Sequence, residues 1–341
     1  MTLKKPLQLT NSLPSILTSA IVAITCAIAL SACGNASTET ADNEQATEKT
    51  TISNGEVITI YSSRNEQLIK PLLDKYSNET GTTIELVTDK AGPLIARLKA
   101  EGSSTPADMF LTVDAGNLWQ AANKGLLQPF TSPTIEANVP AKYRDPKNRW
   151  TALSLRARTI FYNPKKVKRG ELYTYEDLAH RRWRGRLCLR TSKKVYNQSL
   201  VASMIHNLGA GGAAYAVKGW VRNLATDVFA DDVALLKAID SGQCAVGIAN
   251  TYYYGRMLEE NPNLNVKLYW ANQSTTGVHV NVSGAGIVAN ADNPSRALDL
   301  IEWLSSDKAQ EVYSSADKEY PVKVDVPVSP MLESWGTFIP D

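Results

Sequence analysis

Three consecutive tyrosines, Tyr252, Tyr253 and Tyr254, stand where an apolar run gives way to a helical pattern. The run from Cys244 to Ala249 has the composition of a buried strand, and Gly-Arg-Met-Leu follows the tyrosines. Side chains that enter a helix from a strand end can converge on one point, whereas consecutive strand residues point to opposite faces. Tyrosines at such a place either pack at the edge of a cleft or supply phenol oxygens as ligands.

Phenol oxygens suit a particular kind of metal ion. A phenolate is a hard anionic donor, unlike the softer thiolates that copper(I) and zinc prefer. Because a free phenol has a pKa of about 10, only a strongly charged cation takes its proton at neutral pH. Iron(III) fits that demand, and three phenolates would balance its charge in a closed cleft. A further tyrosine, Tyr196, lies in another loop that follows a strand-like run.

Other site chemistries have less support in the sequence. The histidines, His180, His206 and His279, are scattered without ligand spacing, and no Cys/His set has zinc spacing. No Gly-x-Ser-x-Gly motif occurs, and the glycines from Gly209 onward match neither phosphate-binding loop pattern. We therefore predict a binding protein and not an enzyme.

The elements that would position these loops alternate between strands and helices. Strand-like runs at 57–61, 84–87 and 108–113 are each followed by a helical pattern, of which Gly81 ends the first and Gly125 the last. A βαβα order of this kind predicts an α/β fold with an open, mostly parallel sheet.

Two extended stretches, 145–162 and 278–289, interrupt the alternation. Long strands without an intervening helix are typical of a crossing from one lobe to another. The sequence therefore predicts a clamshell of two α/β lobes, joined by extended hinge crossings, with the ligand in the cleft between them. The predicted division is lobe 1 at 55–155 plus 278–316, lobe 2 at 156–277, and a C-terminal segment at 317–341 that either lobe could hold.

Composition and charge are ordinary for a globular protein. Of the 341 residues, 43% are hydrophobic and 21% are charged, which excludes a chain that is disordered throughout. The 36 Lys and Arg nearly balance the 34 Asp and Glu, so nucleic acid is not an expected partner. A local basic cluster from His180 to Arg186 is either a solvated surface or a phosphate-binding patch.

The N-terminus has the pattern of an export signal. Two lysines precede an apolar run from Ile16 to Leu30, and Leu-Ser-Ala leads to Cys33. This order also resembles the bacterial lipobox, whose cysteine is acylated after cleavage; a plain signal peptide is the alternative. We predict a lipoprotein signal peptide at 1–32, a lipid on Cys33 and a flexible tether at 33–54. The protein would then lie in the periplasm or cell envelope, anchored by its lipid.

Two further cysteines, Cys188 and Cys244, lie in short strand-like runs. Because exported compartments are oxidising, a disulfide between them is the simplest prediction, and two buried thiols are the alternative. In either case their role is structural.

From about Val57 to Val322 the chain resembles the periplasmic ferric-ion-binding proteins of bacterial iron ABC transporters, which are counterparts of a transferrin lobe. The resemblance rests on an ordered set of motifs: Tyr61-Ser-Ser-Arg64, Pro106-Ala-Asp108, Thr191-Ser-Lys-Lys-Val-Tyr196-Asn-Gln-Ser199, Asn250-Thr-Tyr-Tyr253, Ser283-Gly-Ala285 and Glu319-Tyr-Pro321. It implies a type II periplasmic-binding-protein clamshell that binds Fe(III) and delivers it to an inner-membrane permease. We expect a monomer.

The resemblance also implies a set of metal ligands. The paired tyrosine ligands of the family match Tyr252 and Tyr253, and a third tyrosine ligand, found in one subgroup, matches Tyr196. Tyr254 stands where other members have varied aromatic residues, so it is assigned to packing.

Two departures from the family narrow the scheme further. Some members place a histidine after the Ser-x-Arg loop, where this chain has Asn65 and Glu66. Another subgroup has an acidic ligand where this chain has Val113, with Asp114 one residue later. The resemblance therefore favours coordination by tyrosines alone.

Three phenolates leave half of an iron(III) octahedron empty. Family members of this kind often fill it with an anion such as carbonate, and an arginine fork with a helix N-terminus suits a small oxyanion. The candidates for contacting the anion or supporting the ligands are Arg64, Thr191, Ser192 and Asn250, and further metal-ligand candidates are Glu66 and Tyr61. For Arg64 a surface ion pair is the alternative.

Two other functions remain compatible with the sequence. One is a clamshell for another small ligand, such as a polyamine, thiamine or an oxyanion, although cationic and apolar ligands favour Trp cages and acidic groups. The other is an envelope lipoprotein with an interaction role and no metal, in which the tyrosines only pack.

Overall fold

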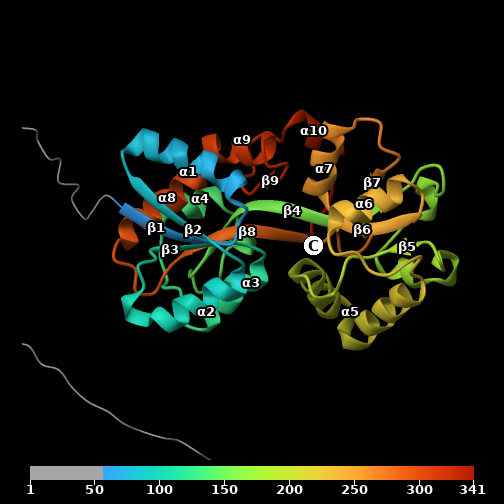
Figure 1. The fold of residues 1–341 in the computed structure, drawn as a ribbon, viewed down its shortest axis with the longest axis horizontal. Coiled ribbons are helices and arrows are strands. Elements are labelled where there is room, and N and C mark those ends of the chain that lie inside the picture. Colours follow the sequence, from blue (N-terminus) through green and yellow to red (C-terminus); the bar gives the residue numbers. More distant parts are fainter. Residues whose placement is uncertain (1–56) are drawn as a thin grey trace, which may run out of the picture. The chain divides into compact units, whose positions relative to one another are not determined.

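The computed structural model describes residues 57–341 of the chain. The predicted signal peptide, the lipidation site at Cys33 and the predicted tether lie outside the described residues. Residues 57–341 form a mixed α/β structure, as the sequence predicts (Figure 1). Within this part of the chain, no helix is both long and apolar enough to span a membrane.

The sheet is mixed. Its strands lie in the order β2 (Thr83–Thr88), β1 (Val57–Ser62), β3 (Met109–Val113), β8 (Val280–Ile287), β4 (Thr151–Tyr162), β6 (Val246–Asn250) and β5 (Leu187–Cys188). The pairs β1–β2, β1–β3 and β5–β6 are parallel, whereas β8 and β4 run antiparallel to their neighbours. The sheet is less parallel than expected, because β8 inserts between β3 and β4 and runs antiparallel to both.

The long strand β4 joins two groups of strands. All 12 of its residues are buried. Up to Ala157 it pairs with β8, and from Arg158 onward it pairs with β6, with β7 (Lys267–Tyr269) on its other edge at the far end. We refer to β1, β2, β3 and β8 with their helices as the first half, and to β5, β6 and β7 with theirs as the second half (left and right in Figure 1).

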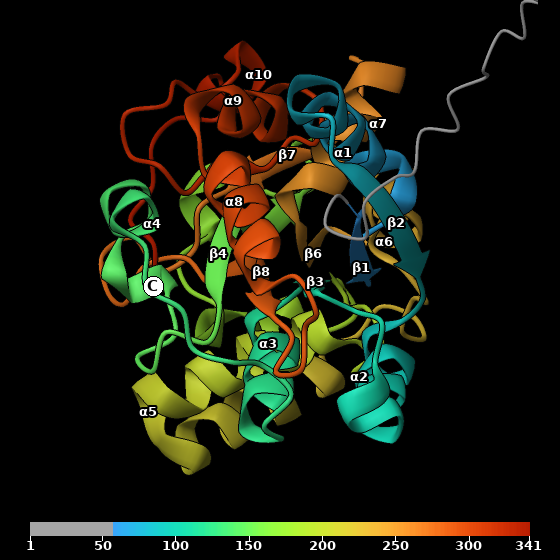
Figure 2. The ribbon, with the colours of Figure 1, turned by 90° about the vertical axis from the view of Figure 1, so that its left-hand side faces the viewer.

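Helices cover both faces of the first half. On one face lie α1 (Glu66–Thr80) and α8 (Pro294–Leu304), and on the other lie α2 (Ala91–Glu101) and α3 (Ala115–Asn123) (Figures 1 and 2). The side chains of β1 alternate between these faces, because strand residues have a period of two. Ile60 packs on the α1 side and Tyr61 on the α2 side.

The second half contains α5 (Val195–Arg222), α6 (Asp232–Asp240) and α7 (Thr251–Glu260). Helix α5 bends at Gly209, whose φ of 72° and ψ of 166° are not helical. Glycine adopts this backbone region readily, which allows the bend. Cys188 and Cys244 are buried and disulfide-bonded, with their Cα atoms 5.9 Å apart. The predicted disulfide is therefore confirmed.

The remaining α-helices and the remaining strand are short and lie beside the first half or in the C-terminal segment. They are α4 (Pro133–Asn138), α9 (Asp307–Ser315), β9 (Tyr320–Pro321) and α10 (Pro330–Glu333). Strand β9 pairs with the first-half end of β4, whereas Trp335 after α10 packs its ring against Tyr254 of α7, with 5.6 Å between centroids. The C-terminal segment therefore contacts both halves.

Candidate metal centre

Three phenols come together in the second half. Strand β6 ends at Asn250 and α7 begins at the next residue, so Tyr252 and Tyr253 lie in the first turn of α7. Their ring centroids are 4.2 Å apart. Tyr196 is the second residue of α5, and it lies close enough to Tyr252 that each influences the pKa of the other. We call Tyr196, Tyr252 and Tyr253 the phenol cluster.

Burial holds two of these phenols, Tyr196 and Tyr252, in their protonated form. Loss of hydration raises the pKa of Tyr252 well above its ordinary value, and the neighbouring Tyr196 and Tyr253 raise it further. Burial also raises the pKa of Tyr196, although the Arg156 guanidinium opposes part of that shift. A phenolate therefore forms here when a cation replaces the proton.

The helices favour a negative charge at the same place. Tyr196 is in the first turn of α5, and Tyr252 and Tyr253 are in the first turn of α7. The free N–H groups of a helix N-terminus carry a partial positive charge, which stabilises an anion within that turn. Two separate helices therefore direct their positive ends toward the cluster.

Two buried arginines lie over the phenol rings. The guanidinium carbon of Arg156, on β4, is 5.6 Å from the ring centroid of Tyr196. That of Arg190, just after β5, is 5.4 Å from the centroid of Tyr196 and 6.0 Å from that of Tyr253. A guanidinium at this range stabilises a phenolate more than a phenol. The site thus combines ionisable oxygens with fixed positive charge.

A buried carboxylate holds the arginines of the second half in place. Asp232, the first residue of α6, is fully buried and accepts a hydrogen bond from Arg158 Nη1 at 3.0 Å, and it lies 3.5 Å from Arg190 Nη1. Asn250 accepts a second bond from Arg158 Nη1 at 2.9 Å. Asn250 therefore positions Arg158 at the strand end from which the tyrosines follow.

The loop before α5 is connected to the same arginines. Asn197, next to Tyr196, accepts a bond from Arg158 Nε at 2.9 Å and donates to the Arg190 carbonyl at 2.7 Å. In this loop the Thr191 amide donates to Phe229, whereas Ser192 is exposed and its carbonyl accepts from Gln198. Chain connectivity thus places Thr191 and Ser192 within a few residues of Tyr196.

Arg64 takes part in a buried ion-pair network and not in a surface pair. Its Nη2 donates to Asp317 at 2.6 Å, and its Nη1 donates to Glu319 at 3.1 Å and to Ser283 at 2.8 Å. Arg156 Nη1 also donates to Ser283, at 2.7 Å, and lies 3.6 Å from Glu319. We call Arg64, Arg156, Asp317, Glu319 and Ser283 the charge network. Arg156 belongs to this network and also contacts the phenol cluster.

The other candidates lie apart from the cluster. The Tyr61 hydroxyl donates to Glu101 of α2 at 2.9 Å, and burial with that carboxylate raises the pKa of Tyr61 to about 12. Glu66 is exposed in the first turn of α1. Tyr254 turns into the core, where its hydroxyl donates to the Val266 carbonyl at 3.0 Å. Among residues 57–341, no three His, Cys, Asp or Glu side chains are grouped to hold a metal.

Residues 104–340 match the model of a family described as bacterial extracellular solute-binding protein. The chain belongs to this family. It is 42% identical over 290 residues to iron uptake protein A1 of Synechocystis sp., covering 83% of this chain and 81% of the relative. It is 29% identical over 282 residues to the Fe(3+)-binding periplasmic protein of Serratia marcescens, covering 81% of each.

Solved structures agree with these relatives. A Trichodesmium protein in complex with iron and citrate superposes on this solute-binding protein with a TM-score of 0.80 and 41% identity, covering 84% of this chain and 92% of that one. The predicted type II clamshell fold is therefore confirmed, as is the resemblance to the ferric-ion-binding proteins. The exact residue boundaries of the two lobes stay a prediction.

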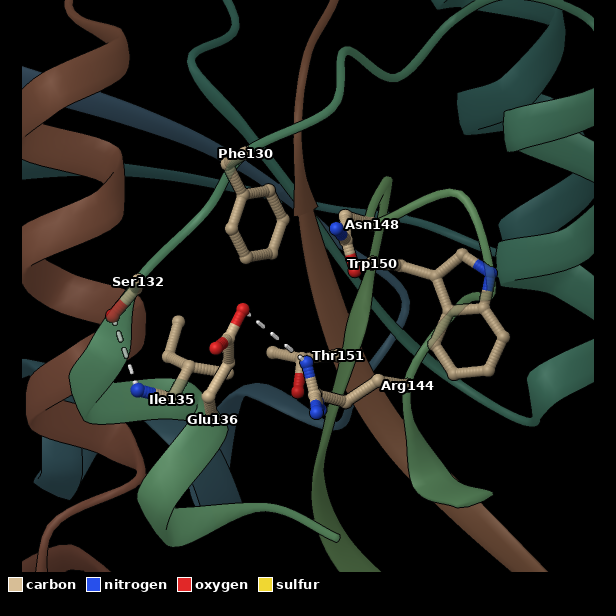
Figure 3. A pocket seen from close by; sticks show the side chains of 8 residues that line it. All are labelled: Phe130, Ser132, Ile135, Glu136, Arg144, Asn148, Trp150 and Thr151. Atoms are coloured by element: carbon tan, nitrogen blue, oxygen red, sulfur yellow. Dashed lines mark hydrogen bonds and ion pairs between the residues drawn. The ribbon is translucent and has the colours of Figure 1, made fainter. Parts of the chain in front are cut away.

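The solute-binding protein also has a small pocket in its first half (Figure 3). Phe130 and Ile135 form part of its apolar lining, and Glu136 pairs with Arg144 at 3.8 Å beside it. Ser132 caps α4 by accepting the Ile135 amide. The pocket includes no member of the phenol cluster, so it is separate from the candidate metal centre.

The sequence did not predict two functional candidates of the solute-binding protein, Arg156 and Arg190. A signal for the first was present, since Arg156 and Arg158 interrupt an otherwise apolar strand, and a charge in a buried strand needs a partner. Arg190 gave no comparable signal. Only the pairing of β5 with β6 brings it beside the tyrosines.

Proposed function

We propose that this protein binds ferric iron through Tyr196, Tyr252 and Tyr253 and delivers it to an ABC-transporter permease in the inner membrane. The observation that carries the proposal is the convergence of three phenols from two separate helix starts. Iron(III) is the biological cation whose charge and hardness match three phenolates. The names of the Synechocystis and Serratia relatives support iron as the cargo and the periplasm as the location.

Charge balance supports an additional anion beside the iron. Three phenolates would neutralise Fe(III), but Arg158 and Arg190 share the single carboxylate of Asp232, so one positive charge remains beside the cluster. Arg156 Nε and Arg190 Nη1 are buried, and neither has a hydrogen-bond partner in the described part of the chain. Buried donors are rarely left unpaired, so a small oxyanion such as carbonate or citrate would satisfy them and complete the coordination of the metal.

The roles of the earlier candidates follow from their contacts. Asn250 would support the site through Arg158, and Thr191 and Ser192 would contact the anion from the loop before Tyr196. Arg64 would act at a distance, because its Nη1 and Nη2 groups donate to Ser283, Glu319 and Asp317. Glu66 and Tyr61 would lie outside the coordination shell.

A titration with ferric citrate tests the proposal. Phenolate bound to iron(III) gives a visible charge-transfer band, so the purified mature protein should turn red-orange and saturate at one iron per chain. Single Tyr→Phe substitutions at positions 196, 252 and 253 should each weaken or shift the band. A protein that stays colourless and retains no iron after desalting would refute the function, whereas unchanged bands in all three variants would refute only the ligand set.

The cellular setting proposed from the sequence has its own test. A lipid on Cys33, with residues 33–54 as a tether, would hold a monomer at the membrane, with lobe 1 at 55–155 plus 278–316 and lobe 2 at 156–277. Intact-mass measurement of the protein from membranes should show cleavage before Cys33 and acyl chains on it. A mass without acyl groups, or a start at another residue, would contradict the anchor.

A further inference from the structure

Asp114 lies at the point where the two halves meet. It follows β3 in the first half and caps α3, its carboxylate accepting the Gly116 amide at 2.9 Å. Asn281 of β8 donates to the same carboxylate at 2.6 Å. The residue is fully buried, so each of these hydrogen bonds is shielded from water.

The remaining partner of Asp114 comes from the other half. Ser199 Oγ, on α5, lies 2.8 Å from Oδ1 and 2.9 Å from Oδ2 of Asp114. Ser199 is three residues after Tyr196, one helical turn further along α5. The hydrogen bond therefore ties the first half to the helix that carries one of the phenols.

The backbone at Asp114 has an uncommon conformation. Its φ is 85°, a region that residues other than glycine rarely adopt. Strained residues of this kind persist where the surrounding contacts over-determine them, and they concentrate at functional sites. Gly116 leaves room for the arrangement, because a Cβ there would lie 3.0 Å from Asp114 Oδ1.

We propose that Asp114 and Ser199 form a latch that keeps the two halves closed over the phenol cluster and so slows the release of iron. The inference rests on the proposed function. All three phenols belong to the second half, so their binding of a metal does not by itself require the first half to close. The hydrogen bond between Asp114 and Ser199 would stabilise the closed arrangement of the two halves, and it lies one helical turn from Tyr196.

Asp108 offers a matched control at the opposite end of β3. It is also buried, and its carboxylate accepts the amides of Thr59 at 2.9 Å and Asn293 at 2.7 Å. All of these contacts lie within the first half. Asp108→Asn therefore disturbs a buried carboxylate of the same half without touching the junction between the halves.

The test compares Ser199→Ala, Asp114→Asn and Asp108→Asn in the full mature protein. Iron transfer to excess chelator is followed by loss of the visible band, and small-angle X-ray scattering reports the radius of gyration of iron-free protein. Loss of a hydrogen bond to a buried carboxylate should speed iron release by about tenfold or more in the first two variants. Their radius of gyration should rise, and Asp108→Asn should show neither change.

Ser199→Thr keeps the hydroxyl and should release iron at nearly the wild-type rate. If Asp114→Asn does not fold, Ser199→Ala decides alone. A wild-type release rate together with a wild-type radius of gyration in Ser199→Ala would overturn the latch. If wild-type protein binds no iron, the proposed function fails, while the scattering of the iron-free variants still supports or overturns the latch.

Discussion

The charge network and the phenol cluster are both buried and polar, and they share Arg156, yet their chemistry differs. In the network, two arginines face two carboxylates, Asp317 and Glu319, so the charges cancel within the protein. In the cluster, the oxygens are ionisable phenols, and Arg158 and Arg190 beside them share the single carboxylate of Asp232, so positive charge is in excess. A region whose charges cancel internally is suited to holding a fold, whereas one with excess positive charge and ionisable oxygens is suited to binding a ligand.

The largest effect should come from breaking the network. Arg64→Met removes the guanidinium that pairs with both Asp317 and Glu319. Glu319 keeps Arg156 at 3.6 Å, whereas Asp317 loses the ion pair that the described residues give it. Loss of one partner of a buried ion pair costs about 3–5 kcal/mol. The free energy of unfolding, measured with urea, should fall by that amount. The folded fraction should still give the ferric band.

The exposed pair between Lys70 and Asp74 provides the control for this experiment. Lys70→Met removes a positive charge from the surface of α1, where water screens the interaction. Its urea midpoint should stay close to that of the wild type. An equal loss in both variants would show that the burial of the network is not what makes it stabilising.

The second prediction concerns the cluster, where the effect should fall on affinity and not on stability. Tyr252→Phe keeps the ring packed against Tyr253 and removes one anionic ligand. Loss of an outer-shell contact at a metal site already lowers affinity by about 10–100-fold, so loss of a ligand should exceed about 100-fold. Competition with a chelator measures the affinity, and the melting temperature should change little. A large drop in melting temperature with unchanged affinity would reverse the assignment.

The two regions should also respond to pH in opposite ranges. Burial alone would raise the pKa of Glu319, but Arg64 and Arg156 outweigh it and leave the pKa below the ordinary value of 4.5. A lowered pKa in the folded state stabilises the protein above the unfolded pKa, and this stabilisation is lost as the pH falls through the folded value. The free energy of unfolding, measured with urea, should therefore fall below about pH 4.5. This fall should be less steep in Glu319→Gln.

The contribution of the phenol cluster to stability depends on pH with the opposite sign. The pKa of Tyr252 is raised above 10, so in the unfolded chain this phenol loses its proton at a lower pH than in the folded protein. In iron-free protein its contribution to folding should thus persist below pH 10 and decline only above that value.

The acid prediction for Glu319 has its own contrary outcome. If stability falls with the same slope in Glu319→Gln and in wild type as the pH is lowered, carboxylates other than Glu319 dominate the acid transition.

The sequence predicted the parts of this structure that depend on local pattern. The alternation of elements, the strand-like 145–162 segment that contains β4 and the disulfide all follow from residue types and spacing. The position of Tyr252 and Tyr253 at the start of a helix was also predictable, because it depends only on where an apolar run ends.

What the sequence could not supply depends on contacts between distant segments. Arg64 is more than 250 residues from its partner Asp317, and no spacing rule connects them. Arg190 reaches the tyrosines through the pairing of β5 with β6. The insertion of β8 between β3 and β4, which made the sheet mixed, is likewise a choice of strand order that residue patterns do not encode.

The smallest effect should separate two adjacent tyrosines. Tyr254→Phe removes the hydrogen bond to the Val266 carbonyl, while a Phe ring would still pack between Phe161 and Trp335. A buried hydrogen bond of this kind contributes about 1 kcal/mol, so stability should fall slightly. The ferric titration should match that of wild type, whereas Tyr253→Phe should weaken or shift the band with little change in stability. If Tyr254→Phe weakens iron binding as much as Tyr253→Phe, all three consecutive tyrosines serve the metal and the division between packing and binding is wrong.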